Sequence, residues 1–318
     1  MLPLVLGGTI LYWLYRDFDF SRVRQVFLYG MNGWWMLISL IFGIFSHLFR
    51  GWRWRQTLEP LGACPRRSLC VNAIFISYAA NLVLPRVGEI SRCGILSRYD
   101  GISFSRSLGT VVTERMLDVC CVGVITLFTF LLQTPVFGRF FRTTGTRLAD
   151  LTGLLTSAHL YIILFCVGAL GILIWYLVRT LSFFEKVRGV VFHIWEGISS
   201  LRRVRNKWKF ALYTFLIWFC YFMQFYVCFY CFSFTQHLGV AAGLVLFVGG
   251  TLAVVVPTPN GAGPWHFAIA TLLVLYGVDA TDAGIFALIV HGIQTFLIAL
   301  LGIYALAALP FTNKKLSL

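Results

Sequence analysis

The chain is a series of long apolar runs separated by short connections that hold most of its charges. A helix needs about 20 predominantly apolar residues to cross a bilayer. Five runs approach this length, and a shorter charge-free run lies at the start of the chain. They predict about six full transmembrane helices, at residues 2–15, 33–50, 107–132, 158–178, 210–234 and 283–309. The predicted fold class is an all-α integral membrane protein.

Two further apolar stretches are interrupted, and we do not expect them to cross the membrane as ordinary helices. Residues 71–84 are too short and lead into Pro85-Arg86, and residues 240–276 are broken between Pro257 and Pro264. Irregular backbone at membrane depth survives only where protein or a water-filled cavity satisfies its polar groups. We therefore interpret both stretches as re-entrant broken-helix hairpins that border a cavity.

The order of span, broken segment and span occurs twice, in residues 33–132 and in residues 210–309, with opposite predicted orientation. Inverted repeats whose broken helices meet at mid-membrane are typical of transporters, and the breaks indicate the substrate site. The alternative is a pair of independent hairpins with no true symmetry.

Composition and charge exclude a soluble protein. Hydrophobic residues make up 59% of the chain and charged residues 12%, whereas soluble domains carry about 25% charged residues. The net charge of +14 is explained by basic residues that crowd cytoplasmic connections, and eight of them lie in residues 179–209. We expect one polytopic domain, residues 1–318, with both termini in the cytoplasm, an amphipathic cytoplasmic linker at 180–208 and no nucleic-acid partner.

The strongest chemical signal is a polar constellation around the first break. It comprises Asn81, Arg86, Glu89 and Arg92, followed by Glu114, Arg115 and Asp118. If a helix begins near Phe104, Glu114 lies about 15 Å along it, close to the bilayer centre, and shares a face with Asp118. Each ionisable residue at that depth costs about 2.5–3.5 kcal/mol, so the group needs partners or a functional reason.

Two interpretations of these charges stay open, and they are compatible. One is an internal ion-pair network in which Arg86 or Arg92 neutralises the carboxylates. The other is substrate contact, because arginine forks bind phosphate at two points and stay charged in a low dielectric. A proton or Na⁺ relay through Glu89, Glu114 and Asp118 is a further alternative.

The second break concentrates helix breakers around Asn260, Gly261 and Gly263. Pro264 suits the first turn of a new helix, whose N-terminus would point into the membrane and favour an anion. His266 lies in that first turn, where it could titrate or donate a hydrogen bond, although a lone histidine more often has a structural role.

Other candidates are weaker. The segment Arg50-Gly-Trp-Arg53-Trp-Arg55 at the end of a span is interpreted as an aromatic and basic anchor at the membrane interface, with head-group contact as the alternative. Cys228 and Cys231 fall inside a span, where packing is expected rather than redox chemistry. The histidines show no zinc-ligand spacing, and no cofactor is predicted.

Three ordered motifs resemble the flippase-like, lysylphosphatidylglycerol synthase transmembrane-region family. They are Arg50-x-x-Arg53-Trp54, Asn81-Leu-x-Leu-Pro85-Arg86-x-Gly88-Glu89-x-x-Arg92, and Gly101-Ile-Ser-Phe-Ser-Arg-x-Leu108-x-Thr110-Val-Val-x-Glu114-Arg115-x-x-Asp118. The second break is similar to the family's Pro-Gly-Gly-x-Gly signature, with Asn260 in place of the first glycine. Asn is the next best residue for a positive φ.

The resemblance implies movement of a lipid between leaflets, either an aminoacylated phospholipid or a polyprenyl-phosphate glycolipid. Bifunctional members carry a soluble aminoacyltransferase domain after the membrane part. The chain ends at Leu318 without one, so we expect a transporter rather than an enzyme, with a separate lipid-modifying synthase as a candidate partner.

The leading hypothesis is a lipid translocator of the bacterial inner membrane that recognises an anionic head group. The proposed cavity contains Asn81, Arg86, Glu89, Arg92, Glu114, Arg115 and Asp118, facing Asn260, Gly261, Gly263 and His266. The second hypothesis is an ion-coupled carrier of a small anionic solute. The third is a membrane-embedded lipid-phosphate transferase with Asp118 or His266 as its base.

Overall fold

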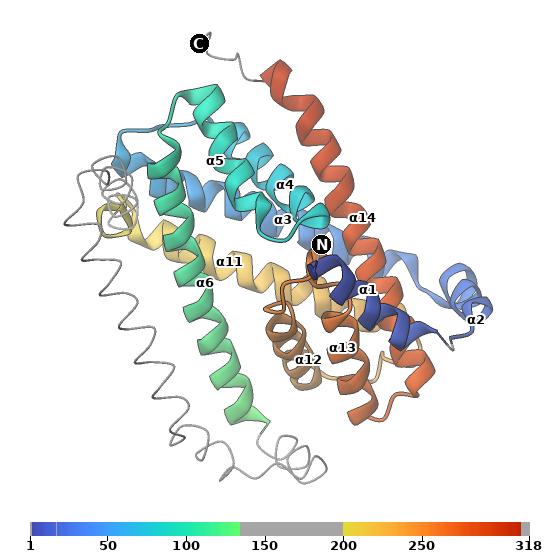
Figure 1. Ribbon diagram of the computed structural model, residues 1–318. Helices are drawn as coiled ribbons and strands as arrows, with labels where there is room; N and C mark the ends of the chain where they lie inside the picture. Colours follow the sequence, from blue (N-terminus) through green and yellow to red (C-terminus); the bar gives the residue numbers. More distant parts are fainter. Residues whose placement is uncertain (1, 17, 134–199, 313–318) are drawn as a thin grey trace, which may run out of the picture.

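The structure, a computed structural model, describes residues 2–16, 18–133 and 200–312, and these are built from helices and their connections (Figure 1). The predicted span 158–178 and most of the predicted linker 180–208 lie outside the described residues. In chain order the elements are α1 (Leu2–Tyr15), α2 (Phe20–Gln25), η1 (Val26–Gly30), α3 (Gly33–Leu58), η2 (Glu59–Leu61), α4 (Arg67–Val83), α5 (Val87–Asp100), α6 (Phe104–Leu132), η4 (Ser200–Arg203), α11 (Lys207–Tyr226), η5 (Val227–Cys231), α12 (Val240–Ala253), η6 (Pro259–Gly261), α13 (Pro264–Leu275) and α14 (Ala280–Thr312).

Within the described residues, four helical segments are long and apolar enough to cross a membrane. They are Gly33–Leu61, Phe104–Leu132, Lys207–Cys231 and Ala280–Phe311, and they confirm the spans predicted from residues 33, 107, 210 and 283 onward. The α1 helix is one of the shorter apolar helices, so the total of six spans stays a prediction. The protein is an all-helical, multi-pass membrane protein.

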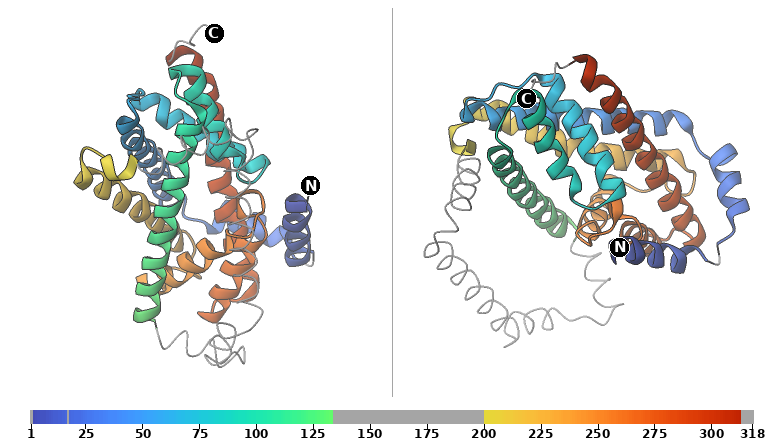
Figure 2. Two further views of the ribbon diagram at one scale, coloured as in Figure 1. Left: turned by 60° about the vertical axis from the view of Figure 1, so that its left-hand side comes forward. Right: turned by 45° about the horizontal axis from the view of Figure 1, so that its top comes forward.

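The first predicted break is the turn of a helical hairpin. The α4 and α5 helices lie side by side (Figure 2), and residues 84–86 join them. Arg86 adopts a left-handed conformation with φ 67°, and the Asn81 side chain accepts a hydrogen bond from the Gly88 amide at 2.8 Å. The basic residues of 85–106 predict a cytoplasmic connection, but residues 87–100 form a helix that runs back along α4.

The second break has the same form. The α12 and α13 helices pack together, and the backbone between them has positive φ at Asn260 (50°), Gly261 (72°) and Gly263 (94°). Only glycine and, less readily, asparagine adopt such angles without a large steric cost. Pro264 begins α13, as predicted. Entry of either hairpin into the membrane stays a prediction.

The halves 33–132 and 210–309 make matching contacts. The α3 and α11 helices pack against each other, α4 packs on α14, and α12 packs on α6. If α3, α4, α5 and α6 are taken to correspond in order to α11, α12, α13 and α14, the contact of α4 with α14 corresponds to the contact of α12 with α6. The contact of α3 with α11 corresponds to itself. Each first hairpin arm therefore packs against the last long helix of the other half.

Candidate functional site

The α6 helix has one buried polar face. Ser107, Thr110, Glu114 and Asp118 are all buried, whereas Met116, Val119 and Leu127 are exposed. The spacing of the residues predicts this division, because positions three and four apart share a helix face. The two carboxylates therefore point into the protein.

Two arginines of α3 pair with the carboxylates of α6: Arg50 with Asp118, and Arg53 with both Asp118 and Glu114. Arg50 Nη1 donates to Asp118 Oδ2 at 2.8 Å, and Arg53 Nη2 donates to Asp118 Oδ1 at 3.0 Å. Arg53 Nε lies 3.4 Å from Glu114 Oε1. Arg53 is 0% exposed and Arg50 is 2% exposed, so all three of these contacts are buried inside the protein.

Arg92 of α5 and Arg115 of α6 complete the cluster. Arg92 Nη1 donates to Glu114 Oε2 at 2.8 Å, and Arg115 Nη2 lies 3.2 Å from Asp118 Oδ2. The Arg92 guanidinium also stacks 4.7 Å from the centre of the Trp54 ring. We name Arg50, Arg53, Arg92, Arg115, Glu114 and Asp118 the arginine cluster.

The structure corrects the interpretation of the 50–55 segment. The α3 helix continues to Leu58, and Arg50, Arg53 and Trp54 are buried inside the protein, so they do not form an interfacial anchor. Of Arg86 and Arg92, the two arginines predicted to neutralise the carboxylates, Arg92 pairs with Glu114. The spacing of three residues between Arg50 and Arg53 is the sequence signal that both share one face of a continuing helix.

The arginine cluster holds more positive than negative charge, since four guanidinium groups surround two carboxylates. Three of its buried donors, Nε and Nη2 of Arg92 and Nε of Arg115, have no hydrogen-bond partner in the part of the chain that the structure describes. A buried donor without a partner costs free energy that an acceptor ligand would recover. The cluster is thus electrostatically suited to an anion.

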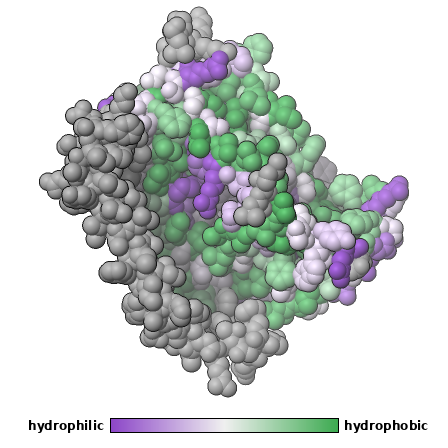
Figure 3. Space-filling model, in the orientation of Figure 1, coloured by the Kyte–Doolittle hydropathy of each residue, from purple (hydrophilic) through white to green (hydrophobic). Residues whose placement is uncertain are grey.

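A groove of about 720 Å³ opens between α5 and α6, beside the arginine cluster. Its polar lining consists of Arg86, Glu89 and Arg115, and the rest of its lining is formed by Leu108, Val111, Val112, Met116, Val119 and Cys120. The surface view shows a hydrophilic patch framed by apolar surface between α6 and the hairpin turn (Figure 3). Charged and apolar groups in one groove match the two parts of a lipid.

Comparison with known proteins identifies the family. The sequence profile described as "Lysylphosphatidylglycerol synthase TM region" matches residues 1–302. This chain belongs to that family. It is also 30% identical over 81 residues to "Glycosyltransferase AglD" of Haloferax volcanii, a match that covers 25% of this chain and 13% of that protein. No solved structure matches.

In this family member, the second break forms a separate cluster against α14. Asn260 Nδ2 donates to Thr295 Oγ1 at 2.8 Å, and His291 Nε2 lies 3.0 Å from the Asn260 carbonyl oxygen. The Gly263 amide donates to His266 Nδ1 at 3.4 Å, and the rings of His266 and His291 are 4.5 Å apart. The predicted residues Asn260, Gly261, Gly263 and His266 therefore lie together, and the η6 turn that contains two of them also contacts α4 of the first hairpin.

Close packing explains the glycine at position 263. A Cβ on Gly263 would lie 2.9 Å from the Gly7 carbonyl oxygen and 3.1 Å from Ile10 Cβ, so α1 covers the second break. His266 is 3% exposed and its ring accepts a hydrogen bond within its own first turn, a geometry typical of a structural histidine.

A cavity of about 290 Å³ is lined by residues of both halves. Tyr78 and Tyr221 line one part of it and Trp265, from the second break, lines another. Arg50 Nε donates to the Tyr221 hydroxyl at 3.2 Å, and the hydroxyl groups of Tyr78 and Tyr221 are 2.8 Å apart. This aromatic pair therefore connects the arginine cluster with the interior between the halves, and sequence patterns gave no sign of it.

The described residues 2–16, 18–133 and 200–312 contain no group of three or more His, Cys, Asp or Glu side chains that could hold a metal ion. The arginine cluster supplies guanidinium groups and paired carboxylates, and the neighbouring Tyr78 and Tyr221 supply hydroxyl groups.

Proposed function

We propose that this protein moves an anionic or aminoacylated phospholipid, or a polyprenyl-phosphate glycolipid, between the leaflets of the bacterial inner membrane. The observation that carries the proposal is the groove between α5 and α6, where Arg86, Glu89 and Arg115 adjoin an apolar wall. Membership of the lysylphosphatidylglycerol synthase TM region family supports a lipid substrate.

The head group would bind where the charges gather. The phosphate would accept hydrogen bonds from Arg86 and Arg115, since guanidinium groups bind phosphate at two points. An aminoacyl ammonium group would find Glu89, whose Oε2 is buried and has no hydrogen-bond partner among the described residues. The acyl chains would stay against the apolar wall and the surrounding lipid.

Movement across the membrane would come from alternating access. The two halves pack through α3 and α11 and exchange hairpin contacts, an arrangement in which one half can rock against the other around a fixed site. A synthase that supplies an aminoacylated lipid is the partner we expect for that substrate.

The alternatives receive less support from the geometry. An ion-coupled carrier would need a carboxylate that releases and binds a cation. Glu114 is held by two arginines and Asp118 by three, which leaves Glu89 as the relay carboxylate with an unpartnered oxygen among the described residues. A carboxylate paired with arginines is a weak proton acceptor, which also disfavours Asp118 as the base of a transferase. His266 already accepts a hydrogen bond from Gly263.

Replacing Arg115 tests the proposal. Arg115→Gln removes one cation from the groove, and its side chain is 42% exposed, so the fold should tolerate the change. Hydrogen bonds to charged groups contribute about 1.5–3 kcal/mol, which predicts a loss of about tenfold or more in leaflet exchange of a fluorescent anionic phospholipid in proteoliposomes.

The matched control is Arg98→Gln, which removes an exposed arginine of α5 outside the groove and should leave exchange unchanged. Normal exchange by folded Arg115→Gln protein would refute the assignment of the groove. Mass spectrometry of co-purified lipid gives a second measurement, in which Arg86→Ala should lose a lipid that the unmodified protein retains.

A further inference from the structure

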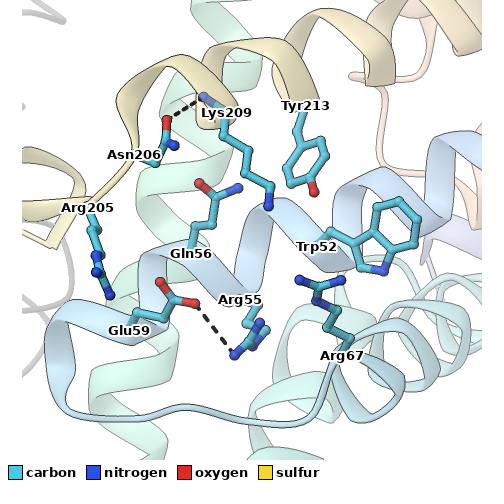
Figure 4. Close-up of a pocket in the computed structure, with 9 residues that line it drawn as sticks. All are labelled: Trp52, Arg55, Gln56, Glu59, Arg67, Arg205, Asn206, Lys209 and Tyr213. Carbon is cyan, nitrogen blue, oxygen red and sulfur yellow. Dashed lines mark hydrogen bonds and ion pairs between the residues drawn. The ribbon is translucent and has the colours of Figure 1, made fainter.

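A second polar pocket lies where α3 ends and α4 and α11 begin (Figure 4). Its volume is about 330 Å³, and it shares no lining residue with the groove between α5 and α6. Among the described residues, four cationic side chains line it, from Arg55, Arg67, Arg205 and Lys209, and one carboxylate, that of Glu59. We call this the α3–α11 pocket.

Gln56 gives an independent indication of a ligand in this pocket. Its side chain is 8% exposed, yet its Nε2 donor has no hydrogen-bond partner within the described residues. Figure 4 shows its carboxamide inside the ring of labelled side chains, beside Lys209. A buried amide donor that faces a cationic pocket calls for an acceptor oxygen, which a bound anion would supply.

The pocket is also organised in advance. Arg55 is fixed by a hydrogen bond from its Nε to the Pro65 carbonyl oxygen at 2.8 Å and by Glu59 at 3.7 Å. Two helices begin at the pocket, α4 at Arg67 and α11 at Lys207. The positive ends of their dipoles add to the attraction for an anion.

We propose that the α3–α11 pocket binds a phosphate group. Arginine forks, a lysine ammonium and an amide donor are the groups that bind phosphate oxygens in proteins. Trp52 and Tyr213 also line the pocket, and Trp208 beside it is 88% exposed. Exposed tryptophan and tyrosine mark the level of lipid head groups, so a phospholipid head group is the source that this depth favours. The site is distinct from the groove, and the proposal holds whether or not the protein translocates lipid.

The test measures binding and makes no use of leaflet exchange. Native mass spectrometry of the full chain in detergent, with added dioleoyl phosphatidylglycerol, counts bound lipids and gives their apparent affinities. Arg205 and Lys209 are exposed, so the double variant Arg205→Gln/Lys209→Gln should fold. We expect it to lose one bound phosphatidylglycerol, or to bind it about tenfold more weakly, because two charged contacts are removed.

A gain of affinity provides the second arm, which misfolding cannot imitate. Glu59→Gln removes the one carboxylate among the described residues that line the pocket and should therefore tighten phosphatidylglycerol binding. The control variant Arg98→Gln, which removes an exposed arginine of α5 outside both the pocket and the groove, should leave this binding unchanged.

Inorganic phosphate distinguishes the two sources of the group. Displacement of phosphatidylglycerol by millimolar phosphate supports a site for a free anion, whereas its failure to displace the lipid supports a head-group site. Unchanged binding of both phosphatidylglycerol and inorganic phosphate by the double variant would overturn the proposal. So would weaker lipid binding by Glu59→Gln.

Discussion

At the scale of single residues, the arginine cluster is the costliest feature of the chain. Arg53 and Arg92 are 0% and 1% exposed, and Glu114 is 1% exposed. Charges at that depth are retained only when paired, since desolvation costs several kcal/mol for each ion. Buried guanidinium groups in excess of the carboxylates lower the stability of the protein when no anion is bound. The free energy of unfolding should therefore respond to the loss of a carboxylate.

Glu114→Gln should destabilise the protein by about 3–5 kcal/mol, because it leaves buried arginines facing a single remaining carboxylate. The matched control is Glu59→Gln, which carries the same chemical change. Glu59 is 30% exposed and pairs with Arg55 at only 3.7 Å, so its loss should cost about 0–1 kcal/mol.

Thermal unfolding in detergent, followed by tryptophan fluorescence, compares the two variants. Equal midpoints would show that the Glu114 pairs contribute no more than a surface contact, which contradicts the buried geometry.

The sequence located four of the six residues of this cluster, namely Arg92, Glu114, Arg115 and Asp118. Helical spacing placed Glu114 and Asp118 on one buried face and required partners for them. It did not identify Arg50 and Arg53, which lie 68 and 65 residues before Asp118. An arginine at the end of an apolar run is more often an interfacial anchor, and only the packing of α3 on α6 distinguishes the two roles.

At the scale of elements, the hairpin turns depend on close backbone approach. A Cβ on Gly88 would overlap the Ser77 carbonyl oxygen, so α4 and α5 touch through their backbones near the turn. Small residues permit such contacts between membrane helices. The breaks at Pro85 and Pro257 were visible in the sequence, because proline and glycine interrupt apolar runs. The α5 helix was not, since its polar composition resembles that of an aqueous connection.

Gly88→Ala should destabilise the hairpin by about 1–3 kcal/mol, the usual cost of overpacking. Gly94→Ala is the matched control in the same helix, where a Cβ would meet no atom within 4 Å. It should be neutral or stabilising by up to roughly 1 kcal/mol, because alanine is the better helix former.

Thermal midpoints of the two alanine variants in detergent decide the matter. A Gly88→Ala protein as stable as Gly94→Ala would show that the close approach of α4 to α5 is not required.

At the scale of the whole molecule, the two halves match in contacts and differ in charge. The α6 helix carries Glu114 and Asp118, whereas α14 presents His291 and Thr295 to its own break. Pairing of elements therefore follows the repeat, but the arginine cluster lies entirely in the first half. The apolar pattern predicts the same order of elements in both halves. It cannot predict that each hairpin packs against the last long helix of the other half, because those contacts join residues far apart in the chain.

The contacts between connections also bear on orientation. Arg22 pairs with Asp282 at 2.7 Å, and the Asn32 amide donates to the Cys231 carbonyl oxygen at 2.8 Å. Segments 18–32, 231–239 and 277–282 therefore meet at one end of the molecule. The basic loop 179–209 is predicted to be cytoplasmic, and alternation of the predicted spans from it assigns residues 16–32 and 277–282 to the outer side. The α3–α11 pocket gathers segments that the same rule assigns to the cytoplasm.

Cysteine labelling tests this orientation directly. Cys64 is exposed between η2 and α4 and should react with a membrane-impermeant maleimide only after the cells are permeabilised, because the basic segments around it belong in the cytoplasm. Gln236→Cys, at an exposed position between η5 and α12, should react in intact cells. Each cysteine is tested in a background that lacks the others, so that one site gives one signal. Labelling of Cys64 in intact cells would reverse the orientation, and it would move the α3–α11 pocket to the outer leaflet.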